Sequence, residues 1–162
     1  MATPENLIFT LGLLSALGCG VMAGLFYAFS FCIMNALNRQ PPAQAASAMQ
    51  SINETIINPI YFVLFFGTGT VCAISAVTSL MFWGVPEAVC LLSGGVLYLI
   101  GSLLVTFRFN IPMNNTLASF KGNDEKGGAY WPTYFQQWTT WNHVRFASSV
   151  TSATLFIIAI GL

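Results

Sequence analysis

The sequence predicts an all-α integral membrane protein, a four-helix bundle with short amphipathic helices at its cytoplasmic surface. Of the 162 residues, 56 % are hydrophobic and only 6 % are charged, whereas a soluble domain carries about 25 % charged residues. Three long gaps between charged residues, and an apolar run that reaches the last residue, can supply the roughly 20 apolar residues that cross a hydrocarbon core. We therefore expect one domain with membrane spans at about residues 7–34, 60–83, 88–107 and 140–162.

The first span is predicted to end at the prolines of residues 39–42, because proline cannot continue the hydrogen-bond ladder of a helix. It contains Gly20-x-x-x-Gly24, a pattern of small residues that lets another helix approach closely. The pattern leaves a homodimer open. After the prolines, apolar side chains recur at helical spacing, which predicts a short amphipathic helix at the membrane surface: Ala45, Met49, Ile52 and Ile56.

The second and third spans are separated by a tight turn at residues 84–87. We expect the third span to stop before Pro112, because the residue that precedes a proline is disfavoured in helical geometry. A solvated loop, residues 121–128, comes next, and the aromatic-rich segment 130–141 that follows has the composition of a membrane–water interface. The last helix is predicted to begin near Pro132, since proline is favoured at the first helical position.

Basic residues predict the orientation of the chain. With four spans, the first and third connections lie on one side of the membrane, and both termini lie on the other. All five basic residues fall on the side of the two longer connections: Arg39, Arg108, Lys121, Lys126 and Arg145. The positive-inside rule then places these connections in the cytoplasm and both termini outside, most simply in a bacterial inner membrane.

Polar residues from all four spans gather at this predicted cytoplasmic end, which indicates a ligand site because such groups are costly in a membrane. The candidates are Asn35, Glu54, Asn58, Arg108, Asn110, Asn114, Trp141, Asn142, His143 and Arg145. On a helix, Asn142 and Arg145 share a stripe with Trp138 and Ser149, whereas His143 lies about 100° round from Asn142. Two arginines against one carboxylate leave a positive surplus, which would suit an anionic or enolate-like ligand.

Metal and nucleic-acid ligands are not predicted. The formal net charge is zero, which argues against nucleic acid as a partner. His143 is the only histidine, and the H-x-x-x-H and E-x-x-H spacings of many metal sites are missing. A metal held by Glu54, His143 and amides, or a haem with one axial ligand, stays open as a less favoured alternative.

Four segments resemble the anthrone-oxygenase-like integral membrane proteins, a large family mostly of unknown function. They are residues 26–30, 49–53, 109–114 and 138–145, which read FYAFS, MQSIN, FNIPMN and WTTWNHVR. Fungal members are implicated in oxidising polyketide anthrones to anthraquinones without a prosthetic group. The resemblance therefore implies a cofactor-independent oxygenase, with O₂ as co-substrate and a small lipophilic aromatic as substrate.

That chemistry needs a base, positive groups that hold the substrate anion, and a dry pocket. By the resemblance, His143 would be the base, with Glu54 as the second choice. Arg145 and Arg108 would stabilise the oxyanion. The other candidates would position the substrate: Asn35, Asn58, Asn110, Asn114, Trp141 and Asn142.

The substrate could also be a quinone or another lipophilic phenol, which fits the site as well as an anthrone does. Two readings other than an oxygenase stay open. The protein could instead be a non-enzymatic membrane protein that binds or passes a small lipophilic or anionic ligand, or a structural subunit whose polar groups only anchor helices. Replacing His143 by alanine separates the oxygenase reading from these two, because the substitution should abolish turnover only in an enzyme.

Overall fold

The computed structural model describes residues 4–122 and 124–162, and every long element in them is helical. In chain order the elements are α1 (Pro4–Tyr27), η1 (Ala28–Ile33), α2 (Met34–Leu37), α3 (Pro42–Ile56), α4 (Pro59–Met81), α5 (Pro86–Tyr98), η2 (Leu99–Leu104), η3 (Thr106–Asn110), α6 (Ile111–Ala118) and α7 (Asp124–Gly161). The η elements are wider π-helical turns. They join their neighbours into two long rods, α1–η1–α2 and α5–η2–η3–α6.

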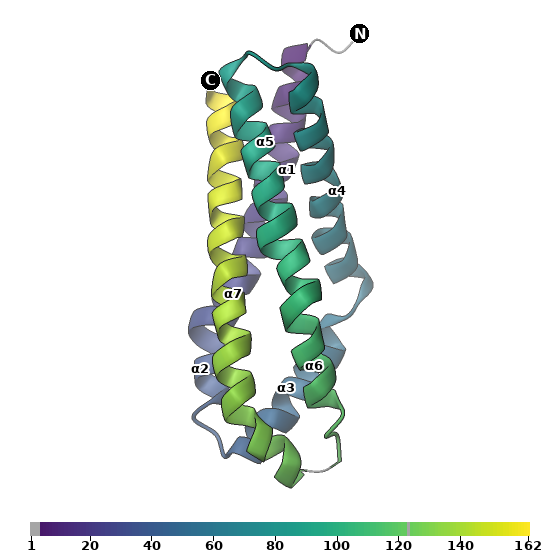
Figure 1. Ribbon diagram of the computed structural model, residues 1–162, viewed down its shortest axis with the longest axis vertical. Helices are drawn as coiled ribbons and strands as arrows, with labels where there is room; N and C mark the ends of the chain where they lie inside the picture. Colours follow the sequence, from purple (N-terminus) through teal and green to yellow (C-terminus); the bar gives the residue numbers. More distant parts are fainter. Residues whose placement is uncertain (1–3, 123) are drawn as a thin grey trace.

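The protein is a multi-pass membrane protein, since four helices are long and apolar enough to cross a bilayer: Asn6–Leu37, Pro59–Met81, Pro86–Ala118 and Asp124–Gly161. They run side by side, with the start of α1 and the end of α7 at one end of the bundle (Figure 1). The helices α2, α3 and α6 lie at the other end, called here the loop end. The predicted all-α four-helix bundle is confirmed.

The four long helices close into a ring. α1 packs against α7 and α4, and α5 packs against the same two helices. Small residues allow these close approaches: a side chain at Gly95 would meet the backbone carbonyl of Cys72, and one at Gly101 would meet Ser148. Hydroxyl groups pair across the same seams, with the Oγ atoms of Ser102 and Ser149 2.7 Å apart.

Gly20 and Gly24 do not take part in this packing. Both are exposed, and no described atom lies within 4 Å of a Cβ placed at either residue. Their face is therefore not used between helices within the described chain. A homodimer through it stays a prediction.

The amphipathic helix after the first span is confirmed as α3. Ala45 and Met49 are fully buried, because the apolar face of α3 packs against the first turns of α7 rather than lying free on the membrane surface. This packing encloses the loop end of the bundle.

Two predicted helix boundaries are wrong. The helix of span three does not stop at Pro112 but continues to Ala118, because the π-helical turn η3 ends just before the proline and makes the break in the hydrogen-bond pattern that a proline requires. Helix α7 begins at Asp124, eight residues before Pro132. Its early turns are stabilised by Trp131 and Tyr134, which are buried against α3 and α6, so tertiary packing outweighs the local cost of an internal proline.

Candidate functional site

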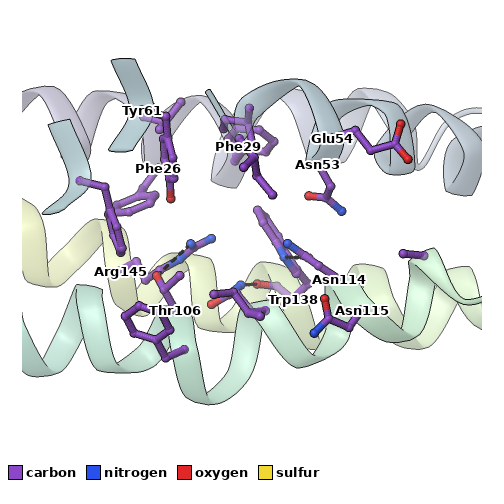
Figure 2. A pocket seen from close by; sticks show the side chains of 18 of the residues that line it. Phe26, Phe29, Asn53, Glu54, Tyr61, Thr106, Asn114, Asn115, Trp138 and Arg145 are labelled. Carbon is purple, nitrogen blue, oxygen red and sulfur yellow. Dashed lines mark hydrogen bonds between the residues drawn. The ribbon is translucent and has the colours of Figure 1, made fainter. Parts of the chain in front are cut away.

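A cavity of about 410 Å³ opens at the loop end, between α1, α3, α4, η3, α6 and α7. This volume lies in the range of small-molecule sites. Eight aromatic side chains make most of its lining apolar: Phe26, Phe29, Tyr61, Phe62, Phe65, Phe66, Phe107 and Trp138. Polar side chains enter at a few points only, and their arrangement along the cavity is seen in Figure 2.

Arg145 is the buried cation of this cavity, and only 4 % of its surface is exposed. Its Nη2 donates to Asn142 Oδ1 at 2.6 Å, and its Nη1 donates to Thr106 Oγ1 at 3.2 Å. The guanidinium carbon lies 4.5 Å from the ring centre of Phe26 and 5.0 Å from that of Trp138, so cation–π contacts hold the group on two further sides.

The charge of Arg145 is not balanced within the described chain. No carboxylate of the described residues forms an ion pair with Arg145, and the buried Nε has no hydrogen-bond partner among them. A buried charge normally needs a counter-ion, and a buried donor without an acceptor is destabilising. The arrangement is therefore suited to an anion or a carbonyl oxygen in the cavity.

Asn142 fixes Arg145 to the first span. Its amide donates to the backbone oxygen of Phe26 and to Ser30 Oγ, both at 2.7 Å, while its Oδ1 accepts from Arg145. Asn142 is fully buried and does not line the cavity. It is a positioning residue for Arg145 rather than a direct ligand contact.

Two other asparagines organise the opposite wall. Asn114 Oδ1 accepts from Trp138 Nε1 and from the Tyr134 hydroxyl, each at 2.8 Å, and so locks α6 against α7. Asn110 donates to the backbone oxygen of Trp138 at 3.3 Å. Its own Oδ1 is buried without a partner among the described residues, which leaves one acceptor beside the cavity for a ligand.

An ion pair between Glu54 and Lys121 lies at the exposed end of the cavity. Both side chains are more than half exposed, so the pair contributes little to stability and can open readily. Gln50 also ties α3 to α6, since its Nε2 donates to the backbone oxygen of Leu117 at 2.8 Å. Figure 2 shows Glu54 and Arg145 at opposite ends of the cavity.

Of the ten residues predicted for the site, four line the cavity: Glu54, Asn110, Asn114 and Arg145. Asn142 supports Arg145 from behind. Asn58 lies at the N-terminus of α4, where its Oδ1 accepts from the backbone N–H of Tyr61 at 3.0 Å. Its observed contact is a helix cap.

The other four predicted residues lie outside the cavity lining. His143 is exposed, and its ring centre lies 5.2 Å from that of Phe31, as its position round the helix from Asn142 predicted. Trp141 stacks on Phe109 at 3.5 Å between ring centres. Asn35 is exposed and donates to the backbone oxygen of Phe31.

Only one of the two arginines counted in the predicted positive surplus lies at the cavity. Arg108 is exposed, and its guanidinium carbon lies 5.5 Å from the ring centre of Phe109. The side chains of η3 that turn inward are Thr106 and Asn110, so Arg108, between them in sequence, points outward. Arg145 alone supplies buried positive charge among the described lining residues.

Tyr61, Phe26 and Thr106 were missed by the sequence analysis but line the cavity. One signal for Tyr61 was available, since it is the only tyrosine in the predicted second span. Phe26 belongs to the segment 26–30 that carries the family resemblance, whereas Thr106 carries no such signal. Within residues 4–122 and 124–162, no group of three or more His, Cys, Asp or Glu side chains could hold a metal ion.

No curated protein and no solved structure matches the chain significantly. A sequence model of the anthrone oxygenase family matches residues 61–155, more than half of the 162 residues. The match covers the cavity residues of α4, η3, α6 and α7, with Arg145 among them. The chain therefore belongs to the anthrone oxygenase family.

Proposed function

We propose that the protein is a membrane-embedded oxygenase that oxidises a lipophilic aromatic substrate of anthrone or phenol type with O₂, without a prosthetic group. The observation that carries this proposal is the unbalanced guanidinium of Arg145 in an aromatic cavity. A preorganised donor in a water-poor site stabilises an anion that would be costly to form elsewhere. Family membership supports oxygenase chemistry at the same coarse level.

For an anthrone-type substrate, the reaction begins with loss of a proton from the CH₂ group beside the aromatic rings. The resulting anion carries its charge on the former carbonyl oxygen, which is attached to the central ring and which Arg145 binds. It gives one electron to O₂, and the two radicals combine to a peroxide at the same carbon, which then takes up a proton. Loss of the second C–H proton and of hydroxide breaks the O–O bond, so that CH₂ and O₂ become C=O and H₂O.

Glu54 is the better candidate for the base in this geometry. It is the only acidic residue among the described residues that line the cavity, whereas His143 packs on the outer face of the bundle. In an anthrone the acidic CH₂ and the carbonyl oxygen lie on opposite sides of the central ring. A base at the far end of the cavity from Arg145 fits that arrangement (Figure 2).

The substrate is proposed to enter from the bilayer. Phe62, Phe66 and Phe107 line the cavity and are 40–45 % exposed, on helices that would face lipid in the bilayer. Apolar side chains therefore connect the cavity with the region that lipid tails occupy. By the positive-inside rule, the basic residues near the loop end support an entrance from the cytoplasmic leaflet.

The test is oxygen uptake by the purified protein with an emodin-type anthrone, corrected for spontaneous oxidation. We expect Arg145→Gln to lower the rate by about 10²–10³-fold, the usual cost of removing one oxyanion donor. Arg108→Gln is the matched control, because it removes an arginine from the same end of the bundle but outside the cavity. It should keep the wild-type rate.

Binding without turnover is the alternative function, and one observation favours it: Glu54, the only carboxylate among the described lining residues, is already paired with Lys121. A small lipophilic or anionic ligand would then be held or passed rather than oxidised. No uptake above the blank with anthrones and related phenols, together with ligand binding that Arg145→Gln weakens, would select this alternative. Equal uptake by wild type and Arg145→Gln would contradict the oxyanion role of Arg145.

A further inference from the structure

We propose that Tyr61 is a catalytic residue whose hydroxyl donates to the same substrate oxyanion as Arg145. The two side chains come from different helices, α4 and α7, and both line the cavity. Figure 2 shows Tyr61 extending from α4 into the cavity toward Arg145. The catalytic role rests on the proposed oxygenase function, but the hydrogen bond to an oxyanion does not.

The position of Tyr61 is fixed from two sides. Its backbone N–H donates to Asn58 Oδ1 at 3.0 Å, in the cap that starts α4. Its ring stacks on that of Phe65, with centres 5.5 Å apart and planes 9° apart, and Phe65 is itself only 2 % exposed. A residue held in this way loses little conformational freedom when it binds a ligand, which is the condition for a preorganised donor.

The hydroxyl of Tyr61 contributes no hydrogen bond to the described part of the fold. No described residue forms a hydrogen bond with it, although its neighbour Tyr98 donates to the backbone oxygen of Phe65 at 3.4 Å. Tyr61 therefore brings an O–H group without a partner among the described residues into the cavity that also holds an unused donor, Arg145 Nε, and Figure 2 shows the Tyr61 side chain directed toward Arg145. Two donors that converge on one substrate oxygen form an oxyanion hole, with charge from Arg145 and direction from the Tyr61 hydroxyl.

The experiment compares Tyr61→Phe with two matched variants that also remove one tyrosine hydroxyl. Tyr98→Phe removes a fully buried hydroxyl used inside the bundle, and Tyr27→Phe removes one from a half-exposed side chain on the outer face. Neither residue lines the cavity. Each protein is titrated with a lipophilic nitrophenol, whose phenolate absorbs at a different wavelength from the phenol, and is then assayed for anthrone-dependent oxygen uptake.

We expect Tyr61→Phe to bind the nitrophenolate about tenfold more weakly and to shift the bound probe toward its neutral form, because a hydrogen bond to the charged form is lost. Oxygen uptake should fall by about 10²-fold. Tyr27→Phe should match the wild type in both measurements. Tyr98→Phe should lower only the melting temperature, which separates a structural effect from loss of an oxyanion contact.

The two measurements distinguish failure of this inference from failure of the proposed function. Unchanged nitrophenolate binding and spectrum in Tyr61→Phe would overturn the oxyanion contact, as would a wild-type protein that binds no nitrophenolate. Weaker binding in Tyr61→Phe, with no oxygen uptake by the wild type, would support the contact and reject the oxygenase. Weaker binding together with reduced uptake would support both.

Discussion

The two halves of the bundle solve the problem of polar groups in a membrane in different ways. In the half near the termini, hydroxyls satisfy each other or the backbone: Ser15 pairs with Ser75, and Ser152 donates to the backbone oxygen of Gly94. Glycines such as Gly95 bring the helices close together. Polar residues in this half serve packing.

In the half near the loop end, large aromatic side chains hold the helices apart around a cavity. Four buried polar side-chain atoms of the described residues have no partner, and two of them, Arg145 Nε and Asn110 Oδ1, belong to cavity residues. The other two, Glu87 Oε2 and Thr139 Oγ1, lie outside the cavity lining. Because buried polar groups are normally hydrogen-bonded, an unpartnered polar atom that also faces a cavity marks Arg145 and Asn110 as functional candidates.

The largest effect is expected from the candidate base in the cavity half. Glu54→Gln should lower anthrone-dependent oxygen uptake by about 10²-fold or more, the usual contribution of a general base. His143→Ala should stay within about twofold of the wild type, because His143 lies outside the cavity lining. Parallel rate measurements on the two variants give the answer.

If His143→Ala lowered the rate of oxygen uptake more than Glu54→Gln did, the catalytic base would have to lie on the outer face of the bundle and not in the cavity half. Lys121→Met serves as the control for Glu54→Gln. It breaks the same ion pair but keeps the carboxylate, so it should retain most of the activity.

A smaller effect, on stability alone, is expected in the close-packed half. Gly95→Leu should destabilise the protein by about 3 kcal/mol, because its side chain would meet the backbone of Cys72 and Ala76, which cannot move aside. Gly20→Leu should change stability by less than about 0.5 kcal/mol, since the space beside Gly20 is open. Unfolding in mixed detergent micelles measures both differences.

The Gly20 variant also tests the predicted homodimer. A lower molecular mass for Gly20→Leu than for the wild type, at unchanged monomer stability, would show that this face joins two copies. Equal stability of Gly95→Leu and the wild type would show that the termini half is packed more loosely than described.

The smallest effect is expected where the two halves meet. Asn142→Ala should destabilise the protein by about 2 kcal/mol, because a guanidinium N–H loses its acceptor and Ser30 Oγ and the backbone oxygen of Phe26 lose the amide that donates to them. Ser149→Ala, two positions further along the same stripe, removes a single hydroxyl pair and should cost about 1 kcal/mol. Only Asn142→Ala should also reduce oxygen uptake, through a misplaced Arg145. Equal losses of stability and activity in the two variants would contradict the positioning role.

The fold was largely predictable from the sequence. Charge-free stretches of sufficient length predicted four helices, and helical spacing predicted that Trp138, Asn142, Arg145 and Ser149 share one buried face, which is confirmed. The boundaries at Pro112 and Pro132 were not predictable in the same way. Local preference disfavours helix there, but packing of α3 and α6 against α7 outweighs it.

The site was predicted only in part, for a reason that follows from helix geometry. The three π-helical turns each insert residues into an α-helical repeat and so rotate everything beyond them. An inward position inferred from ideal spacing is therefore unreliable in η3, where Arg108 turns outward and Asn110 inward. No pattern in the sequence predicts this rotation of the helix beyond each π-helical turn.

The sequence by itself determined that the chain crosses a membrane four times, because the length and apolarity of a span must match the bilayer. It also determined that polar groups gather at one end and that Arg145 faces inward on α7. The tertiary structure decided which of these groups meet. Rotation of each helix about its axis depends on packing between helices, and that packing brings Tyr61 to the cavity of Arg145 while leaving His143 on the outer face.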